Sequence, residues 1–243
     1  MILVLNRSFA GFLLFLLTLC LTFAAGVWWL GPAVVSLAAD GNRRGEPYYV
    51  LHLASVPEAV DGGLYFERLR TLVREEQGRL LWRGGLSAVH TGRLADERDN
   101  LLVYEFGTGG DLVQMLTSSA YRDLAGQVPP VLLGTAVGPL AIAQDEVLLL
   151  WLLRLREGER DSGRAGLLDP VVRTAERFDG QSVWSTPLDS IAGQGSWDYL
   201  VVLAFPDPVA LSEWLSDSTT ATELALARKS VTSQTLLEFS GNQ

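Results

Sequence analysis

A short pattern occurs twice in this chain, about a hundred residues apart. In "QGRLLWRGG" (77–85) a glycine precedes a tryptophan by four positions inside an apolar run, and "DGQSVWSTP" (179–187) repeats that spacing. Both the glycine and the tryptophan recur after 102 positions. A repeat of this kind constrains the architecture strongly, because it predicts that the chain folds as two copies of one unit.

Further identities keep a fixed spacing. Apolar residues of two strand-like segments and one helical segment recur after 99 positions, in the pairs Leu53/Leu152, Leu101/Leu200, Val103/Val202, Phe106/Phe205, Leu112/Leu211 and Leu116/Leu215. The spacing between matching residues changes from 99 to 102 and then returns to 99. The second copy must therefore have three extra residues in its first loop and three fewer before its third strand. Compensating length changes in loops, with identities at apolar positions, indicate an internal duplication.

The first copy, residues 48–143, shows the order β-α-β-β-α-β. Apolar, aromatic-rich runs predict strands, and helical spacing of apolar residues predicts helices. The strands are expected at 48–55, 79–92, 100–106 and 131–142, and the helices at 64–77 and 111–126. We interpret Gly78 as the left-handed residue that ends the first helix and Asp111 as the cap of the second. This order is the ferredoxin-like split unit.

The second copy, residues 146–240, runs through the same order. Its strands are expected at 147–155, 181–192, 197–205 and 233–239, and its helices at 166–178 and over 209–217 with its continuation. The runs "VLLLWLL" and "YLVVLAF" do not alternate apolar and polar residues, so both faces of these strands should be covered. Helices can cover one face, and the sheet of the other copy the second. We therefore predict an α+β fold in which two tandem ferredoxin-like repeats face each other as an intrachain pseudo-dimer.

Residues 1–39 are expected to act as a membrane anchor or signal segment, joined by the linker 40–47. The stretch 9–30 is apolar almost throughout and would span roughly 33 Å as a helix, which is enough for the core of a bilayer. A retained anchor with the soluble part outside the cytoplasm is the favoured interpretation. Secretion after signal cleavage near Ser36–Ala38 is the alternative.

Composition excludes several classes of function. The net charge is −9 and no basic cluster is longer than the pair Arg43-Arg44, so we expect no nucleic-acid partner. Two histidines cannot supply a histidine-rich metal site, and the single cysteine, Cys20, excludes an internal disulfide. No nucleotide-binding fingerprint is present. We therefore predict no metal and no cofactor.

A family resemblance rests on three segments: the opening strand "YYVLHL", a helix ended by glycine before an apolar strand, and the helix "LTSSAYRDL" with Ser118 and Tyr121. In these the sequence resembles the dimeric α/β-barrel superfamily, and within it a small uncharacterised bacterial group. The resemblance covers 48–240 and is weaker in the second copy, where "LSDSTTATEL" has no tyrosine. It implies two ferredoxin-like units paired sheet to sheet. With the anchor expected at 9–30, the prediction is a single-pass protein of the bacterial inner membrane with a periplasmic domain. Related branches include monooxygenases, lactone isomerases and haem-handling enzymes, so the fold does not select an activity.

Candidate ligand-binding residues are His52, Trp82 and Tyr104. His52 lies in mid-strand where the second copy has Trp151, so its site is roomy; it is either a buried histidine with a polar neighbour or a pocket base or haem ligand. Trp82 is either a core aromatic residue or part of a cavity between the sheets. Tyr104 and Glu105 must face opposite ways, and we expect Glu105 to point outward in a salt bridge.

Two functions remain open from these residues. The first is a membrane-anchored ligand-binding or interaction module without catalysis, because neither copy displays a recognisable catalytic residue set. The alternative is a cofactor-independent monooxygenase or isomerase that acts on a small apolar substrate in an inter-repeat cavity near His52, Trp82 and Tyr104. Haem binding through His52 is a third hypothesis.

Overall fold

The computed structural model describes most of the chain after the N-terminal segment, namely residues 47–92, 99–137, 140, 142–143, 145–156, 164–193 and 197–241. The predicted anchor at 9–30 lies outside these ranges and stays a prediction. Within them, no helix combines the length and the apolar character needed to cross a bilayer.

The described chain follows the predicted order of strands and helices, except that the strand predicted at 181–192 is divided into two strands and the second helix of each half is broken. The first half contains β1 (Tyr48–Ser55), α2 (Gly62–Glu75), β2 (Gly78–Thr91), β3 (Asp99–Phe106), α3 (Gly109–Thr117), α4 (Ser119–Gln127) and β4 (Pro130–Val137). The second half contains β5 (Val147–Leu155), α6 (Arg164–Glu176), β6 (Gln181–Pro187), β7 (Asp189–Gly193), β8 (Tyr199–Phe205), α7 (Pro208–Ser216), α8 (Ser218–Ala227), the short 3₁₀ turn η1 (Arg228–Ser230) and β9 (Val231–Gly241).

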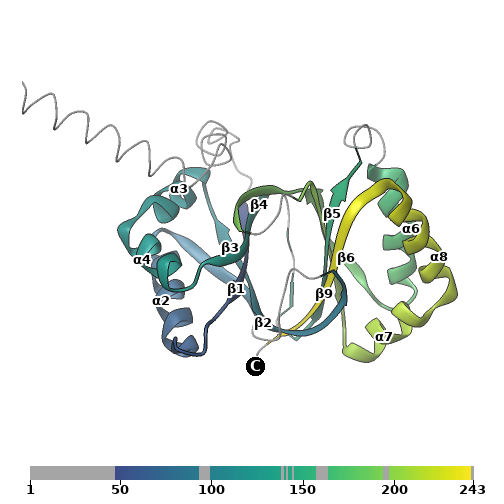
Figure 1. Cartoon of the computed structure of the whole chain (residues 1–243), viewed down its shortest axis with the longest axis horizontal. Coiled ribbons are helices and arrows are strands. Elements are labelled where there is room, and N and C mark those ends of the chain that lie inside the picture. Colours follow the sequence, from purple (N-terminus) through teal and green to yellow (C-terminus); the bar gives the residue numbers. More distant parts are fainter. Residues whose placement is uncertain are drawn as a thin grey trace, which may run out of the picture.

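One curled antiparallel sheet runs through both halves, in the order β6-β8-β5-β9-β2-β3-β1-β4-β7 (Figure 1). The prediction of two separate facing sheets is therefore corrected. The far part of β2 leaves β3 and pairs with β9, with Leu86 opposite Phe239, and β4 pairs with β7, with Leu133 opposite Ala192. Because β6 and β7 are successive segments of the chain, the two ends of the strand order are neighbours, and the sheet curls round on itself.

The repeated glycine has a different role from the one predicted. The left-handed residues that follow the helices are Gln77 and Asp179, with φ of 59° and 56°. Gly78 starts β2 instead, and a Cβ there would lie 2.6 Å from the ring of Phe106. Gly180 makes the same 2.6 Å approach to the equivalent phenylalanine of the second half. The glycine recurs because each half packs a phenylalanine ring against that backbone.

The helix predicted at 111–126 is broken in two. Ser118 ends α3 and caps α4, since its hydroxyl accepts a hydrogen bond from the backbone N–H of Tyr121 at 3.1 Å. Asp217 does the same between α7 and α8, where its carboxylate accepts from the N–H of Thr220 at 2.8 Å. A side-chain oxygen that satisfies the free N–H groups of a new helix fixes this break in both halves.

The start of α3 also differs from expectation. Its cap is Thr108, whose Oγ1 accepts from the backbone N–H of Asp111 at 3.2 Å and donates to the Asp111 carboxylate at 2.7 Å. Asp111 therefore lies in the first turn, where its negative charge also complements the helix dipole.

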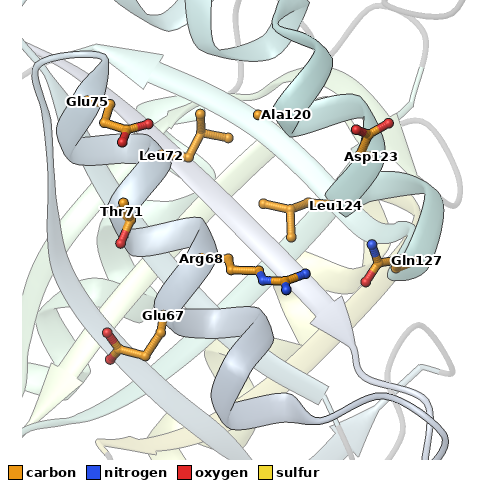
Figure 2. Close-up of a pocket in the computed structure, with 9 residues that line it drawn as sticks. All are labelled: Glu67, Arg68, Thr71, Leu72, Glu75, Ala120, Asp123, Leu124 and Gln127. Carbon is orange, nitrogen blue, oxygen red and sulfur yellow. The ribbon is translucent and has the colours of Figure 1, made fainter.

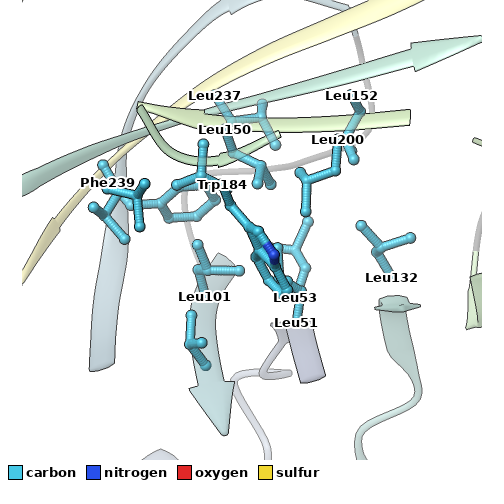
Figure 3. Packing of buried hydrophobic residues seen from close by; sticks show 14 of the residues in the cluster. Leu51, Leu53, Leu101, Leu132, Leu150, Leu152, Trp184, Leu200, Leu237 and Phe239 are labelled. Carbon is cyan, nitrogen blue, oxygen red and sulfur yellow. The ribbon is translucent and has the colours of Figure 1, made fainter. Parts of the chain in front are cut away.

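Buried apolar side chains form three clusters, as expected if both faces of the sheet are covered. One lies beneath α2, α3 and α4, and another beneath α6, α7 and α8. The third lies inside the curled sheet and takes residues from both halves, among them Leu51, Leu53, Leu101, Leu150, Leu152, Trp184, Leu200 and Phe239 (Figure 3). The sheet therefore has an apolar interior and two helix-covered outer faces (Figure 1).

Candidate functional site

The three candidate ligand-binding residues do not line one space. Along β1, His52 has the same parity as Val50 and Ala54, which belong to the cluster beneath the helices. Tyr104 belongs to that outer cluster, whereas Trp82 lies in the cluster inside the sheet. His52 and Tyr104 therefore meet under the helices, and the backbone of the sheet separates them from Trp82.

The interior, where an inter-repeat cavity was expected, is occupied by leucine and tryptophan side chains (Figure 3). Tyr49 of the first half packs edge-on against Trp184 of the second, with ring centroids 5.5 Å apart. The indole N–H groups of Trp82, Trp184 and Trp197 are buried there without a hydrogen-bond partner. Packing across the two halves is thus the evident role of Trp82, and the candidate site moves to the helix-covered face.

His52 is 2% exposed and its closest polar neighbour is Tyr104. The Tyr104 hydroxyl lies 3.5 Å from Nδ1 of His52, and the ring centroids are 6.2 Å apart. Nε2 of His52 is buried without a partner. Burial lowers the pKa of His52 to about 4, because the charged imidazolium loses its hydration. At neutral pH this histidine is uncharged and has one ring nitrogen unused.

Arg83 lies on the same face, two strands away. It stands opposite Leu102 of β3, and Leu102 stands opposite His52 of β1. Its guanidinium carbon lies 3.8 Å from the centroid of the Phe66 ring of α2, a cation–π contact, and its Nε is buried without a partner. Burial lowers the pKa of Arg83, although the charges of Tyr104 and Glu67 act in the opposite direction.

The helices add two further hydroxyls from above. Tyr121 of α4 is 2% exposed, and its hydroxyl is buried without a partner. Burial raises its pKa, and neighbouring Tyr65 of α2 raises it further. The pKa of Tyr104 is raised well above its usual value by burial and then by Tyr65 and Tyr121, while Arg83 lowers it. Tyr65, Arg83 and Tyr121 act on Tyr104, and the Tyr104 hydroxyl lies 3.5 Å from His52. We name these five residues, His52, Tyr65, Arg83, Tyr104 and Tyr121, the tyrosine–histidine cluster.

The second half lacks this cluster. The positions that match His52, Arg83, Tyr104 and Tyr121 at the offsets of 99 and 102 hold Trp151, Ser185, Leu203 and Thr220. Trp151 donates its indole N–H to Gln234 at 3.2 Å, and the hydroxyls of Ser185 and Tyr199 lie 3.2 Å apart. Only Thr220 of these four has a buried polar side-chain atom without a partner. The two halves share a backbone plan but differ in buried polar chemistry.

A surface groove of about 400 Å³ runs between α2 and α4 on the outer side of the helices (Figure 2). Its lining combines three carboxylates and one guanidinium with an apolar floor, and consists of Glu67, Arg68, Thr71, Leu72, Glu75, Ala120, Asp123, Leu124 and Gln127. Figure 2 shows Arg68 reaching from α2 across the groove towards α4.

Sequence reasoning missed Arg83 and Tyr65 as members of the cluster. A signal for Arg83 existed: it directly follows the interior Trp82 in an apolar strand, so its side chain must enter the opposite, helix-covered face. In the sequence, only the family resemblance draws attention to Tyr121. Glu105 was expected to point outward, but it has the parity of interior Val103; it does form the expected salt bridge, with Arg79.

The described residues show no metal centre. Among them, no three histidine, cysteine, aspartate or glutamate side chains come together as metal ligands would. His52 is enclosed, so a haem could reach Nε2 only if α2 and α4 moved apart. Any other ligand would need the same opening, so haem binding through His52 stays a hypothesis from the sequence.

Comparison by sequence gives no relatives. No protein-family model matches the chain, and no curated protein matches it either.

Comparison by structure identifies the fold. An anthrone oxidase-like protein is similar with a TM-score of 0.55 at 12% identity, over 82% of this chain and 93% of that one. A mutant chlorite dismutase from Candidatus Nitrospira defluvii gives 0.54 at 11% identity, over 84% and 94%. A candidate monooxygenase from Fusobacterium nucleatum gives 0.53 at 10% identity, over 81% and 93%. At these identities the likeness defines the fold, the dimeric α/β-barrel of ferredoxin-like units, and leaves the activity to the site.

Proposed function

We propose that the chain is a cofactor-independent enzyme of the monooxygenase or isomerase type, which acts on a small, mainly apolar substrate at the tyrosine–histidine cluster. The observation that carries the proposal is Nε2 of His52, a buried ring nitrogen without a partner, on an imidazole whose Nδ1 lies 3.5 Å from the Tyr104 hydroxyl. Buried polar atoms in folded proteins are nearly always paired, and exceptions call for an explanation such as a ligand. The alternative function expected from the sequence is thus better supported than the non-catalytic module.

The cluster suits removal of a proton next to a carbonyl group. If Nδ1 of His52 donates its hydrogen to the Tyr104 oxygen, Nε2 is free to accept a proton from substrate. Arg83 and the Tyr121 hydroxyl would stabilise the negative charge that forms on the substrate oxygen. An enolate beside His52 would in turn raise the pKa of the imidazole, because it supplies the opposite charge that the empty site lacks.

Oxygenation can follow from that step without a cofactor. An anthrone illustrates the balance: it loses a proton from its methylene carbon, the resulting enolate reacts with O₂, and loss of water leaves a quinone. One oxygen atom of O₂ ends in the new carbonyl group and the other in water. An isomerase would use the same proton removal and return the proton to another carbon, so the two activities share the base and the oxyanion stabilisers.

The test is turnover of anthrone under air by the full chain in detergent, followed by anthraquinone absorbance and by O₂ consumption. We expect His52→Gln to lower the rate by about a hundredfold, the usual contribution of a general base. Tyr104→Phe should lower it less. The matched control is Tyr199→Phe, a strand tyrosine of the second half whose hydroxyl lies 3.2 Å from that of Ser185, which should leave the rate unchanged. A wild-type rate no greater than that of buffer, for anthrone and for enolisable ketones, would contradict the proposal.

A further inference from the structure

We infer that the groove between α2 and α4 is the entrance through which substrate reaches the tyrosine–histidine cluster, and that its charge favours neutral or cationic substrates over anionic ones. This rests on the proposed function, since an entrance presupposes a buried site. It adds the route and the charge class of the substrate.

Two leucines lie between the groove and the tyrosine–histidine cluster. Leu72 and Leu124 line the groove, and both belong to the buried apolar cluster that contains Tyr104 and Tyr121 (Figure 2). Leu124 follows Tyr121 by three residues on α4, so the two side chains are neighbours on one helix face. The two leucines therefore separate the groove from the buried tyrosines.

Unpaired polar atoms lie on the inner side of that floor. The Tyr121 hydroxyl and Nε2 of His52 are both buried without partners, on side chains that are each 2% exposed. A polar atom of an entering molecule would satisfy them. The groove thus adjoins the part of the first half in which a bound molecule would gain hydrogen bonds.

The helices that flank the groove are not tied to each other. In the described part of the chain, no hydrogen bond or ion pair joins α2 to α4. In the second half, the helices that correspond to α2 and α4 are α6 and α8, and there Arg177, next to α6, pairs with Asp217, the cap residue of α8, at 3.2 Å. Parting α2 from α4 breaks apolar contacts alone, which is the kind of local opening that folded proteins permit.

The charge of the groove sets its preference. Among the lining residues, Glu67, Glu75 and Asp123 carry negative charge and Arg68 carries positive charge. Arg70, which does not line the groove, pairs with Glu67 at 2.9 Å, so one negative charge remains in excess. Clefts lined by one sign of charge concentrate ligands of the opposite sign. Glu67 also acts on the charge of Arg83, which links the groove electrostatically to the cluster. Anionic molecules should therefore enter more slowly than neutral or cationic molecules.

Thiol labelling tests the route without reference to turnover. In a Cys20→Ser background, His52→Cys places one thiol in the cluster of the full chain. Methanethiosulfonates carrying a methyl, a 2-aminoethyl or a 2-sulfonatoethyl group react with it; a mixed disulfide forms and methanesulfinate leaves. Rates are divided by those for free 2-mercaptoethanol to remove intrinsic reactivity. The 2-aminoethyl reagent should react roughly fivefold faster than the 2-sulfonatoethyl one, as expected for one close charge pair in water. Glu67→Gln with Asp123→Asn should reduce that ratio.

A bulky side chain in the groove supplies the decisive variant. Ala120 is exposed and lines the groove, and the matched position 99 residues later is exposed Thr219 of α8. Ala120→Trp should slow labelling about tenfold, because the indole must move before the reagent passes. Thr219→Trp should leave the rate unchanged. Equal rates in the two tryptophan variants would overturn the inference.

Two further outcomes separate the proposals. In the first outcome, Ala120→Trp slows labelling, but the wild-type chain turns over neither anthrone nor other ketones. That result would support the entrance and would overturn the proposed enzymatic activity alone. If His52→Cys loses its cooperative thermal unfolding, Tyr121→Cys provides the buried thiol for the same comparison, with the same result required.

Discussion

The two halves of the molecule show how one backbone plan can carry two kinds of buried surface. Both place a phenylalanine ring over a glycine and break the second helix with a side-chain cap. Beneath its helices the first half buries His52 and three tyrosines, with unpaired polar atoms, whereas the second half buries Trp151 and Leu203. The features shared by both halves therefore define the fold, and the differences indicate where a function would be located.

The difference has an energetic meaning. An unpaired buried polar group costs about 1–3 kcal/mol. Both halves bury such groups: His52, Arg83 and Tyr121 lie beneath the helices of the first half, and Thr220 lies beneath those of the second. Proteins commonly carry such costs at functional sites. If the two halves arose by duplication, the second half completes the sheet and the interior core, and the first is free to hold a less stable polar site.

The pH dependence of stability should show the largest contrast between the halves. The pKa of His52 is near 6.5 in the unfolded chain and about 4 in the folded one, so between these values the unfolded state binds more protons. The contribution of neutral His52 is complete above pH 6.5 and is lost as the pH falls towards 4. Urea titrations from pH 7 to pH 4 should therefore lose about 3 kcal/mol more in wild type than in His52→Leu.

Trp151, the matched residue of the second half, has no titratable group, so Trp151→Phe should leave this pH dependence as in wild type. Parallel pH profiles for wild type and His52→Leu would contradict the burial of a neutral histidine.

The fold was predictable because the same pattern of strand-like and helical segments occurs twice in the sequence. Strand runs such as 147–155 and 48–55 fall within a residue of their expected bounds, since apolar composition alone places them. The joined sheet was missed because edge pairing, such as that of Leu86 with Phe239, depends on backbone hydrogen bonds that no residue type marks. A glycine selected by a neighbouring ring likewise resembles a glycine selected by a turn until the contact with Phe106 is known.

The site was predictable only in part. His52 is a candidate in the sequence because the two copies differ at that position. The copies differ at Tyr121 as well, where the second copy has Thr220. The face of the sheet on which each side chain lies could not be predicted, because β2 changes register between Leu80 and Trp82. A bulge shifts the alternation of side chains, so counting from the start of β2 does not assign Trp82 to the interior. Once Trp82 is placed, Arg83 must take the opposite face.

Alanine at the repeated glycine should affect the two halves alike. A Cβ at Gly78 or Gly180 would lie 2.6 Å from a phenylalanine ring, which forces a shift in a packed core. We expect Gly78→Ala and Gly180→Ala each to lower the free energy of unfolding by about 1–3 kcal/mol, the usual cost of overpacking. The matched control is Gly126→Ala on α4, where a Cβ meets nothing within 4 Å and helix propensity should stabilise by roughly 0.5–1 kcal/mol. A neutral result at one glycine alone would show that the two phenylalanine contacts are not equivalent.

Loss of one hydroxyl from beneath the helices should give the smallest effect and the sharpest test of the difference. Thr174→Val leaves the buried indole N–H of Trp214 without its 2.8 Å acceptor, and should cost about 1–2 kcal/mol in urea unfolding. Tyr104→Phe removes a hydroxyl that reaches only Nδ1 of His52 at 3.5 Å, and should cost under about 0.5 kcal/mol because so long a contact contributes little. A Tyr104→Phe chain that is as stable as wild type but turns over more slowly would place that hydroxyl in the chemistry. If Tyr104→Phe costs as much as Thr174→Val, the Tyr104 hydroxyl stabilises the first half as the Thr174 hydroxyl stabilises the second.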